Sequence, residues 1–218
     1  MKDKYLAEIG HIEEGVAEVK HSNKRKSILM IGDSICRGYS PFVREEFKGK
    51  FDVIYPADNC RNSQYIITTL LTWVNEIEDK QNVEVVTFNC GHWDIAHWNG
   101  DEEPLTSIAE YEGNIKKIIR QIKKFFPNAK TIFFTTTPMS PDYNMDSINP
   151  RSNDEIKRYN AVAVKVVKES GVYIENLFSY MEDWTADKFM DYAHLTPDAN
   201  KELGKHISDI ILKVLKGE

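Results

Sequence analysis

Short apolar runs alternate with longer amphipathic stretches along most of the chain. A run without alternating polar residues is typical of a strand buried on both faces, as a parallel sheet requires, and such runs occupy 27–31, 51–55, 83–88, 131–136 and 172–174. The stretches between them carry apolar residues at helical spacing, which predicts helices around 66–74, 108–125, 153–169 and 203–215. This alternation predicts a doubly wound α/β fold, a three-layer α/β/α sandwich around a five-stranded parallel sheet.

The first 26 residues differ from the rest of the chain. Apolar residues at helical spacing predict an amphipathic helix over 4–20, and the polar stretch 20–26 is typical of a solvated linker. We therefore expect one domain over 27–218, preceded by a helix and linker within 1–26.

Composition narrows the classes of partner and compartment. A net charge of −6 argues against a nucleic-acid partner, because such a partner requires a concentrated basic face. No stretch is long and apolar enough to span a bilayer, and charged residues interrupt 1–20, where a signal peptide would be apolar. We therefore expect no membrane association and a cytoplasmic location. The chain has three cysteines, Cys36, Cys60 and Cys90. Three cysteines cannot all form disulfide bonds within one chain, which fits a reducing compartment.

A candidate nucleophile follows the first predicted strand. Ligand sites in parallel α/β sheets form at the carboxyl ends of the strands, here the loops 32–40, 56–63, 89–104, 137–152 and 184–196. In the first loop, Gly32 allows a sharp turn, and Ser34 can present its hydroxyl to the crevice. The alternative is that Asp33 and Ser34 merely cap the next helix.

A candidate acid–base pair lies near the other end of the chain. Asp191 precedes His194 by three residues, so one turn of chain can bring the carboxylate to the imidazole. A carboxylate that accepts the Nδ1 proton leaves Nε2 free to take a proton from a hydroxyl. The alternative is a surface Asp-His pair that precedes a helix.

Taken together, the two motifs carry a resemblance. Gly32-Asp33-Ser34 after the first strand, and Asp191-x-x-His194-Leu-Thr-Pro before the last helix, resemble the SGNH/GDSL hydrolase family over residues 27–216. The resemblance implies a flavodoxin-like topology and a serine esterase that needs no metal or organic cofactor. It also implies that Ser34 is the nucleophile, His194 the base and Asp191 the acid of a catalytic triad.

The middle motifs depart from the family pattern. The second motif usually offers a glycine N–H to the oxyanion, yet the loop here contains Asn59-Cys60-Arg61 and no glycine. The third motif usually reads Gly-x-Asn-Asp, and in the family its asparagine supplies another oxyanion donor. Here the motif begins at Gly91, and Trp93 stands at the position of that asparagine. An indole offers a single N–H on a bulky ring and could not copy an amide without rearrangement. Both loops nevertheless resemble a divergent branch of the family.

We therefore expect other oxyanion donors. The backbone N–H of Ser34, a backbone N–H near Cys60 and one side-chain amide are the expected set, with Asn59 and Asn89 as candidates for the amide. Each asparagine could equally be a turn or strand-end residue that bonds its own backbone. Thr135-Thr136-Thr137-Pro138 and Tyr159-Asn160-Ala161 also resemble the divergent branch.

Other polar residues near the motifs have structural interpretations. We expect Asp33 and Asp94 to tie loops to backbone N–H groups, and Arg61 to pair with one of them rather than with an acidic substrate. The three cysteines and His92 could in principle ligate zinc, but no Cys-x-x-Cys pair is present, so small buried thiols are expected instead. The aromatic residues of loop 92–104 could stack on a sugar ring, cover an acyl chain or roof the core.

The sequence thus predicts an esterase for short acyl groups, with an O-acetyl group on a carbohydrate as the leading substrate by family analogy. A lysophospholipase or thioesterase is the alternative within the enzyme class. A non-catalytic carbohydrate-binding protein that retains the fold is the alternative from another class. The altered middle motifs favour that last alternative, and the intact Ser34, Asp191 and His194 argue against it. The oligomeric state has no signature in the sequence.

Overall fold

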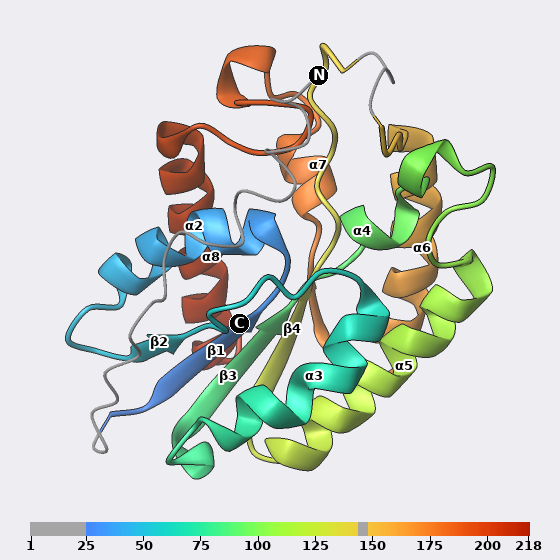
Figure 1. The fold of residues 1–218 in the computed structure, drawn as a ribbon. Helices are drawn as coiled ribbons and strands as arrows, with labels where there is room; N and C mark the ends of the chain where they lie inside the picture. The colour runs from blue at the N-terminus through green and yellow to red at the C-terminus, as the bar shows by residue number, and fades with distance from the viewer. Residues whose placement is uncertain (1–24, 144–147) are drawn as a thin grey trace.

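The computed structural model describes residues 25–143 and 148–218 (Figure 1). The helix predicted over 4–20, and most of the linker after it, lie outside the described residues. No helix within the described ranges combines the length and apolar character needed to cross a bilayer.

A parallel sheet of five strands forms the centre of the fold, as the apolar runs predicted. Its strands follow the order β2-β1-β3-β4-β5, and each pairs with its neighbour in parallel: β1 (Ser27–Ile31), β2 (Asp52–Ile54), β3 (Val83–Phe88), β4 (Lys130–Phe134) and β5 (Tyr173–Glu175). The chain moves outward from β1 in one direction to β2 and then in the other to β3. A flavodoxin-like sheet of this order has its ligand crevice at that reversal, outside the carboxyl ends of β1 and β3.

Helices cover both faces of the sheet (Figure 1). One layer is formed by α2 (Ser34–Glu46) packed against α8 (Pro197–Lys216), and the other by α3 (Ser63–Asn75), α5 (Ile108–Phe125) and α6 (Asn153–Glu169). Short elements lie in the connections: α4 (His92–Ile95), α7 (Leu177–Met181), and the 3₁₀ turns η2 (Lys80–Asn82), η3 (Trp98–Gly100) and η4 (Ala186–Lys188). The layered fold is the predicted one, but the segment 32–40 is mostly helix rather than loop, because α2 begins at Ser34 itself.

Local signals explain where the long helices begin. Ser107 and Ser152 each form a capping box with the glutamate three residues on, at the starts of α5 and α6. Thr196 caps α8, and Pro197 occupies its first turn, where a missing N–H costs nothing.

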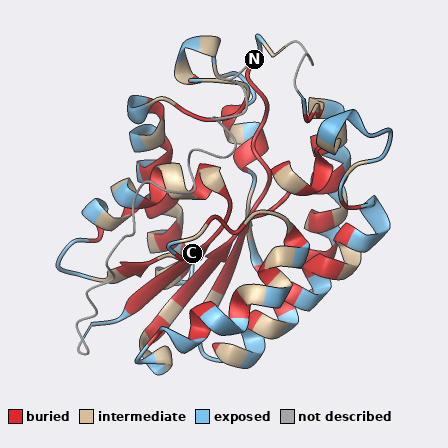
Figure 2. Ribbon diagram, in the orientation of Figure 1, coloured by how far each residue is buried: buried red, intermediate tan, exposed pale blue. Residues whose placement is uncertain are grey.

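The core lies between the sheet and the two helical layers. Every residue of β1 is buried, and Phe88 of β3 contacts Phe133 of β4 with ring centroids 5.0 Å apart (Figure 2). Burying a side chain of this size stabilises the fold by about 1.5–3 kcal/mol. The rigid sheet therefore provides a fixed platform for the loops at its carboxyl edge.

The packing of α2 on α8 depends on close approach at a glycine. A Cβ atom on Gly204 of α8 would lie 2.8 Å from the Cβ of Phe42 and 3.2 Å from the carbonyl oxygen of Tyr39, both on α2. Gly38 of α2 is similarly crowded, by the side chain of Asn200 on α8. The two helices therefore lie closer together than side chains at these positions would permit.

Candidate active site

Ser34 stands at the junction of β1 and α2. Gly32 lets the end of β1 pass close to its neighbours, because a Cβ there would lie 2.0 Å from Asn89 Oδ1 and 2.4 Å from Cys36 Cβ. The next residue, Asp33, caps α2 by accepting a hydrogen bond from the N–H of Ile35 at 3.1 Å. Ser34 is the first residue of the helix, so its own N–H has no acceptor within the helix.

Asp191 and His194 form a compact turn just before α8. Asp191 Oδ1 accepts the backbone N–H groups of Ala193 at 2.9 Å and His194 at 2.8 Å, and Oδ2 accepts a hydrogen bond from His194 Nδ1 at 2.8 Å. Burial by itself would raise the pKa of the Asp191 carboxyl, but the hydrogen bond and charge of His194 and the two backbone N–H groups outweigh it and hold the pKa below its usual value. The carboxylate is therefore ionised at neutral pH and orients the imidazole.

The fold brings this turn to Ser34 across 160 positions of sequence. The Ser34 hydroxyl and His194 Nε2 lie 2.8 Å apart. Because Nδ1 donates to Asp191, Nε2 is the acceptor for the serine proton. Hydroxyl, imidazole and carboxylate thus form one hydrogen-bonded chain, in the arrangement that the two motifs predicted.

Asn89 and Asp33 contact each other behind the serine. Asn89 Nδ2 donates to Asp33 Oδ1 at 3.2 Å, which gives the amide a protein partner. Burial raises the pKa of Asp33, and the Asn89 hydrogen bond opposes that rise. The contacts of Asp33 fit its expected role as a loop tie, whereas the Asn89 amide bonds the Asp33 carboxylate and not its own backbone.

The second motif is held by its own turn. The N–H of Cys60 donates to the carbonyl of Gly32 at 3.2 Å, so this N–H is engaged within the protein, and the expected backbone donor near Cys60 stays a prediction. Asn59 Oδ1 accepts the N–H of Arg61 at 2.8 Å, and Arg61 adopts φ 49°, in the left-handed region that usually favours glycine. Arg61 therefore has the backbone conformation that a glycine would allow in this motif, a feature that the sequence did not reveal.

The side chain of Arg61 has neighbours other than the expected ones. Its guanidinium lies 4.5 Å from the ring centroid of Tyr65 and 3.8 Å from Asp58, whereas we expected Asp33 or Asp94 as its ionic partner. The structural role assigned to Arg61 fits these contacts, but the predicted partner was wrong.

The third motif begins where the chain passes β4. Gly91 has φ 150°, and a Cβ on it would lie 1.9 Å from Thr136 Oγ1, so the motif requires glycine here. Asp94 accepts hydrogen bonds from the N–H and the hydroxyl of Ser63, and burial raises its pKa to about 6. Thr136 is itself locked to α6, because its N–H and carbonyl both bond the Asn160 amide at 2.9 Å. These contacts fit the expectation that Asp94 ties loops together.

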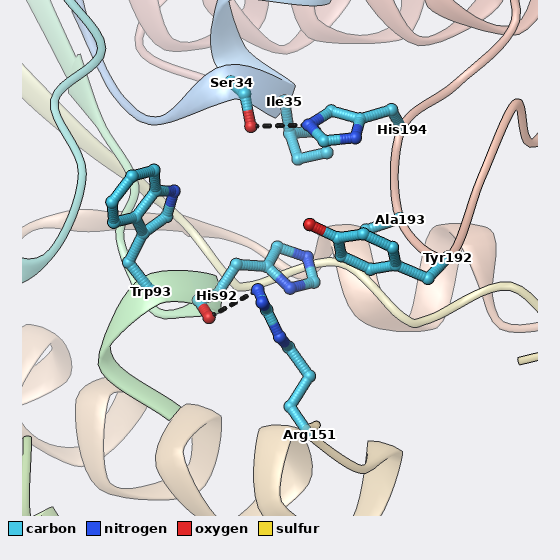
Figure 3. A pocket seen from close by; sticks show the side chains of 8 residues that line it. All are labelled: Ser34, Ile35, His92, Trp93, Arg151, Tyr192, Ala193 and His194. Atoms are coloured by element: carbon cyan, nitrogen blue, oxygen red, sulfur yellow. Dashed lines mark hydrogen bonds between the residues drawn. The ribbon is translucent and has the colours of Figure 1, made fainter. Parts of the chain in front are cut away.

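A pocket opens beside the serine, and Figure 3 shows its lining. Eight residues border it: Ser34, Ile35, His92, Trp93, Arg151, Tyr192, Ala193 and His194. Its empty volume is about 300 Å³ with the solvent at its mouth included. Neither Asn59, Asn89, Cys60 nor Gly91 lines this pocket, whereas Trp93 does.

Sequence interpretation gave no role to four of these lining residues, of which Arg151 and Tyr192 bear polar groups. Arg151 is buried, donates from Nη1 to the His92 carbonyl at 2.7 Å and lies 5.1 Å from the ring centroid of Tyr192. In the sequence, only the position of Arg151 in a strand-end loop indicated that it could lie near the site. Tyr192 lies between Asp191 and His194, and its residue type alone did not indicate a role. The pocket therefore includes a cation and a phenol ring that the motifs did not indicate.

His92 is a neutral component of the pocket wall. Its Nε2 lies 3.0 Å from Thr137 Oγ1, and burial, helped by the charges of Arg151 and His194, holds the pKa of His92 well below its usual value. The three cysteines, suggested with His92 as an alternative zinc set, are buried, and burial raises the pKa of each thiol. Among residues 25–143 and 148–218, no three His, Cys, Asp or Glu side chains gather as a metal site.

Comparison with known proteins decides the family. A model of the GDSL-like lipase/acylhydrolase family matches residues 30–201, which run from β1 into α8 and include Ser34, Asp191 and His194. The chain belongs to the GDSL-like lipase/acylhydrolase family. The resemblance drawn from the two motifs is thereby confirmed.

Relatives of this GDSL hydrolase agree with that assignment. GDSL esterase/lipase CPRD49 of Arabidopsis thaliana is 23% identical over 202 residues, which cover 86% of this chain and 79% of the relative. An acetyl xylan esterase, AlAXEase, superposes with a TM-score of 0.67 at 15% identity, over 85% of this chain and 99% of that one. Est24, a carbohydrate acetylesterase from Sinorhizobium meliloti, gives a TM-score of 0.66 at 13% identity, over 87% and 100% of the two chains. The predicted fold is confirmed, and the GDSL hydrolase is an ester hydrolase.

Proposed function

We propose that this GDSL hydrolase removes short acyl groups, acetyl foremost, from carbohydrate hydroxyls, with Ser34, His194 and Asp191 as its catalytic triad. One observation carries the proposal: the chain of hydrogen bonds from Ser34 Oγ through His194 to Asp191 Oδ2, with 2.8 Å at both links, borders an open pocket. Removing a proton from a serine hydroxyl at neutral pH requires such an adjacent, oriented base.

The reaction follows from the geometry. His194 Nε2 takes the hydroxyl proton as Ser34 Oγ attacks the ester carbonyl, and the Asp191 carboxylate stabilises the imidazolium that forms. The tetrahedral intermediate then expels the sugar alcohol, which receives the proton from His194 and leaves an acyl-serine. Water, deprotonated by the same imidazole, attacks the acyl-serine and releases the carboxylic acid, which restores the serine.

The size of the pocket supports a short acyl group. Ile35 and Ala193 border the serine directly, and the empty space of about 300 Å³ includes solvent at the mouth. An acetyl group needs only a small apolar recess, whereas a long chain needs an extended one.

The lining of that crevice supports a carbohydrate as the alcohol. Trp93 and Tyr192 present aromatic rings next to the polar groups of His92 and Arg151, a mixture suited to a sugar with its apolar ring faces and hydroxyls (Figure 3). The two proteins of related fold named above are an acetyl xylan esterase and a carbohydrate acetylesterase, which supports the same substrate class.

Two experiments test the proposal. A fluorophosphonate probe should label the wild-type protein at Ser34 and leave the Ser34→Ala variant unlabelled. A panel of p-nitrophenyl esters of graded length, together with acetylated sugars, should show highest kcat/KM for acetate and falling values for longer chains. Faster hydrolysis of twelve-carbon esters or lysophospholipids than of acetates would favour the lipase alternative. Binding of acetylated sugars without labelling or turnover would favour a non-catalytic protein.

A further inference from the structure

The indole of Trp93 occupies the place in the third motif where the family resemblance expects an asparagine. Trp93 lines the pocket together with Ser34 and His194. Figure 3 shows the ring edge that carries Nε1 turned toward the space below the serine hydroxyl rather than away from the pocket. The residue therefore presents a polar hydrogen to the region that an ester carbonyl would occupy for attack by Ser34.

That indole N–H has no hydrogen-bond partner within the described parts of the chain. The Trp93 Nε1 atom is not fully enclosed by the protein, so solvent and ligand can reach it. The indole of Trp98 differs, because its Nε1 donates to the Trp93 carbonyl at 3.3 Å. Of these two neighbouring indoles, Trp93 alone keeps its donor available.

The surrounding contacts fix the Trp93 ring. The rings of Trp93 and Trp98 lie 5.0 Å apart at an interplanar angle of 44°. The turn that carries Trp93 is anchored by Asp94 on Ser63 and by the Arg151 hydrogen bond to the His92 carbonyl. A donor held in this way does not have to reorganise when charge develops on the substrate, which is what makes such a donor effective.

Several of the other expected donors have partners within the protein. The Asn89 amide bonds Asp33, the Cys60 N–H bonds Gly32, and the Arg61 N–H bonds Asn59. The Ser34 N–H at the start of α2 remains without an intrahelical acceptor. One backbone donor alone would form a weak oxyanion hole for the proposed reaction.

We propose that the Trp93 indole N–H is a catalytic oxyanion donor, which acts with the Ser34 N–H on the carbonyl oxygen of the ester. The proposal rests on the proposed esterase function and gives the indole a role that we expected an amide to fill. The N–H binds the oxyanion of the tetrahedral intermediate more strongly than the neutral carbonyl of the substrate. Its loss should therefore reduce kcat and leave KM nearly unchanged.

The central experiment removes the N–H and retains an aromatic ring. Trp93→Phe should lower kcat by about 10²–10³-fold, with KM and melting temperature close to those of the wild type. Affinity for a trifluoromethyl ketone, which adds to the serine and forms a hemiketal oxyanion, should fall by the same factor. Trp93→His, which retains a ring N–H, should restore part of kcat.

Two matched variants separate the donor from packing and from its competitor. Trp98→Phe makes the same indole-to-phenyl change at the neighbouring ring but leaves the Trp93 N–H, and its kcat should stay within several-fold of the wild type. Asn59→Ala removes the remaining candidate amide, and its kcat should also stay within several-fold of the wild type. A folded Trp93→Phe with near wild-type kcat, equal losses in Trp93→Phe and Trp98→Phe, or a kcat-specific loss in Asn59→Ala would each overturn the proposal.

A measurement on the wild-type protein covers the case in which Trp93→Phe fails to fold. The chain has four tryptophans, so ¹⁵N-tryptophan labelling gives four indole N–H signals. One signal should move strongly downfield when the trifluoromethyl ketone adduct forms; four unmoved signals in a formed adduct would reject Trp93. Failure of the wild type to react with fluorophosphonate or any ester would instead overturn the proposed function, and this donor with it.

Discussion

The Asp191–His194 turn and the 91–98 segment border the same crevice but are built differently. In the turn, the carboxylate bonds backbone and side-chain groups at most three residues away. The 91–98 segment is held by distant partners, such as Ser63 on Asp94 and Arg151 on the His92 carbonyl. A locally determined geometry follows its motif wherever the motif occurs. A segment positioned from a distance can accept a new side chain, such as Trp93, as long as its distant ties remain.

The largest expected effect comes from the residue that both regions face. Ser34→Ala should lower kcat for acetate esters by about 10³-fold to 10⁶-fold while the melting temperature is preserved, because the small hydroxyl contributes little to packing. Ester hydrolysis rates and thermal unfolding, measured on the same preparation, check this. More than a tenth of wild-type activity would remove Ser34 from its role.

Breaking the local turn should have the next largest effect. Asp191→Asn should lower kcat by about 10³–10⁴-fold, because an amide can hold the imidazole in the wrong tautomer and cannot stabilise the imidazolium. Asp198→Asn, on the exposed first turn of α8, is the matched control and should retain activity. Similar kcat values for the two variants would mean that another group orients His194.

The distant tie at Asp94 predicts a pH effect on stability. Its pKa is 3.8 when exposed and about 6 in the fold, so the folded state holds the proton more tightly. The protonated Asp94 carboxyl therefore stabilises the folded state. This contribution is complete below pH 3.8 and is lost as pH rises through 6, which lowers the free energy of unfolding by up to roughly 3 kcal/mol.

Urea unfolding between pH 4 and pH 7 measures this decrease. The wild type should lose stability with rising pH relative to Asp94→Asn, in which no proton can be lost. Asp209→Asn, an exposed position on α8, should instead follow the wild type. Parallel curves for the wild type and Asp94→Asn would contradict the prediction.

The close approach of the third motif to β4 predicts a smaller loss. Gly91→Ala should lower the free energy of unfolding by roughly 2 kcal/mol, because its φ of 150° is strained for alanine and its Cβ would meet Thr136. Gly113→Ala is the matched control: it lies within α5 with open space around it and should stabilise by about 0.5–1 kcal/mol. Equal stability of the two variants would show that the segment can shift at no cost.

The sequence predicted the parts of the molecule that depend on short-range patterns. The helices Ile108–Phe125 and Asn153–Glu169 have the predicted bounds, because capping boxes and amphipathic spacing define both. Ser34, Asp191 and His194 come together as predicted, since each belongs to a short motif beside an element of the sheet or helical layers.

The parts that depend on distant contacts could not be predicted in the same way. Arg61 adopts a left-handed conformation that its residue type does not signal. Arg151 enters the pocket because of contacts with the His92 carbonyl and Tyr192, residues about 40 to 60 positions away. The N–H of Cys60 donates to the carbonyl of Gly32 because the fold brings their two loops together. Neither loop's sequence alone indicates this contact.

The glycine contact between α2 and α8 has a consequence for how this enzyme can evolve. Ser34 begins one of these helices and His194 lies just before the other, so we expect their separation to respond to how closely Gly204 approaches Tyr39 and Phe42. We therefore expect that a lineage under selection can change kcat through Gly204, without replacing any residue that lines the pocket. A folded Gly204→Ala protein with reduced kcat and unchanged acyl-chain preference would demonstrate such a remote control of rate; an unchanged kcat would exclude it.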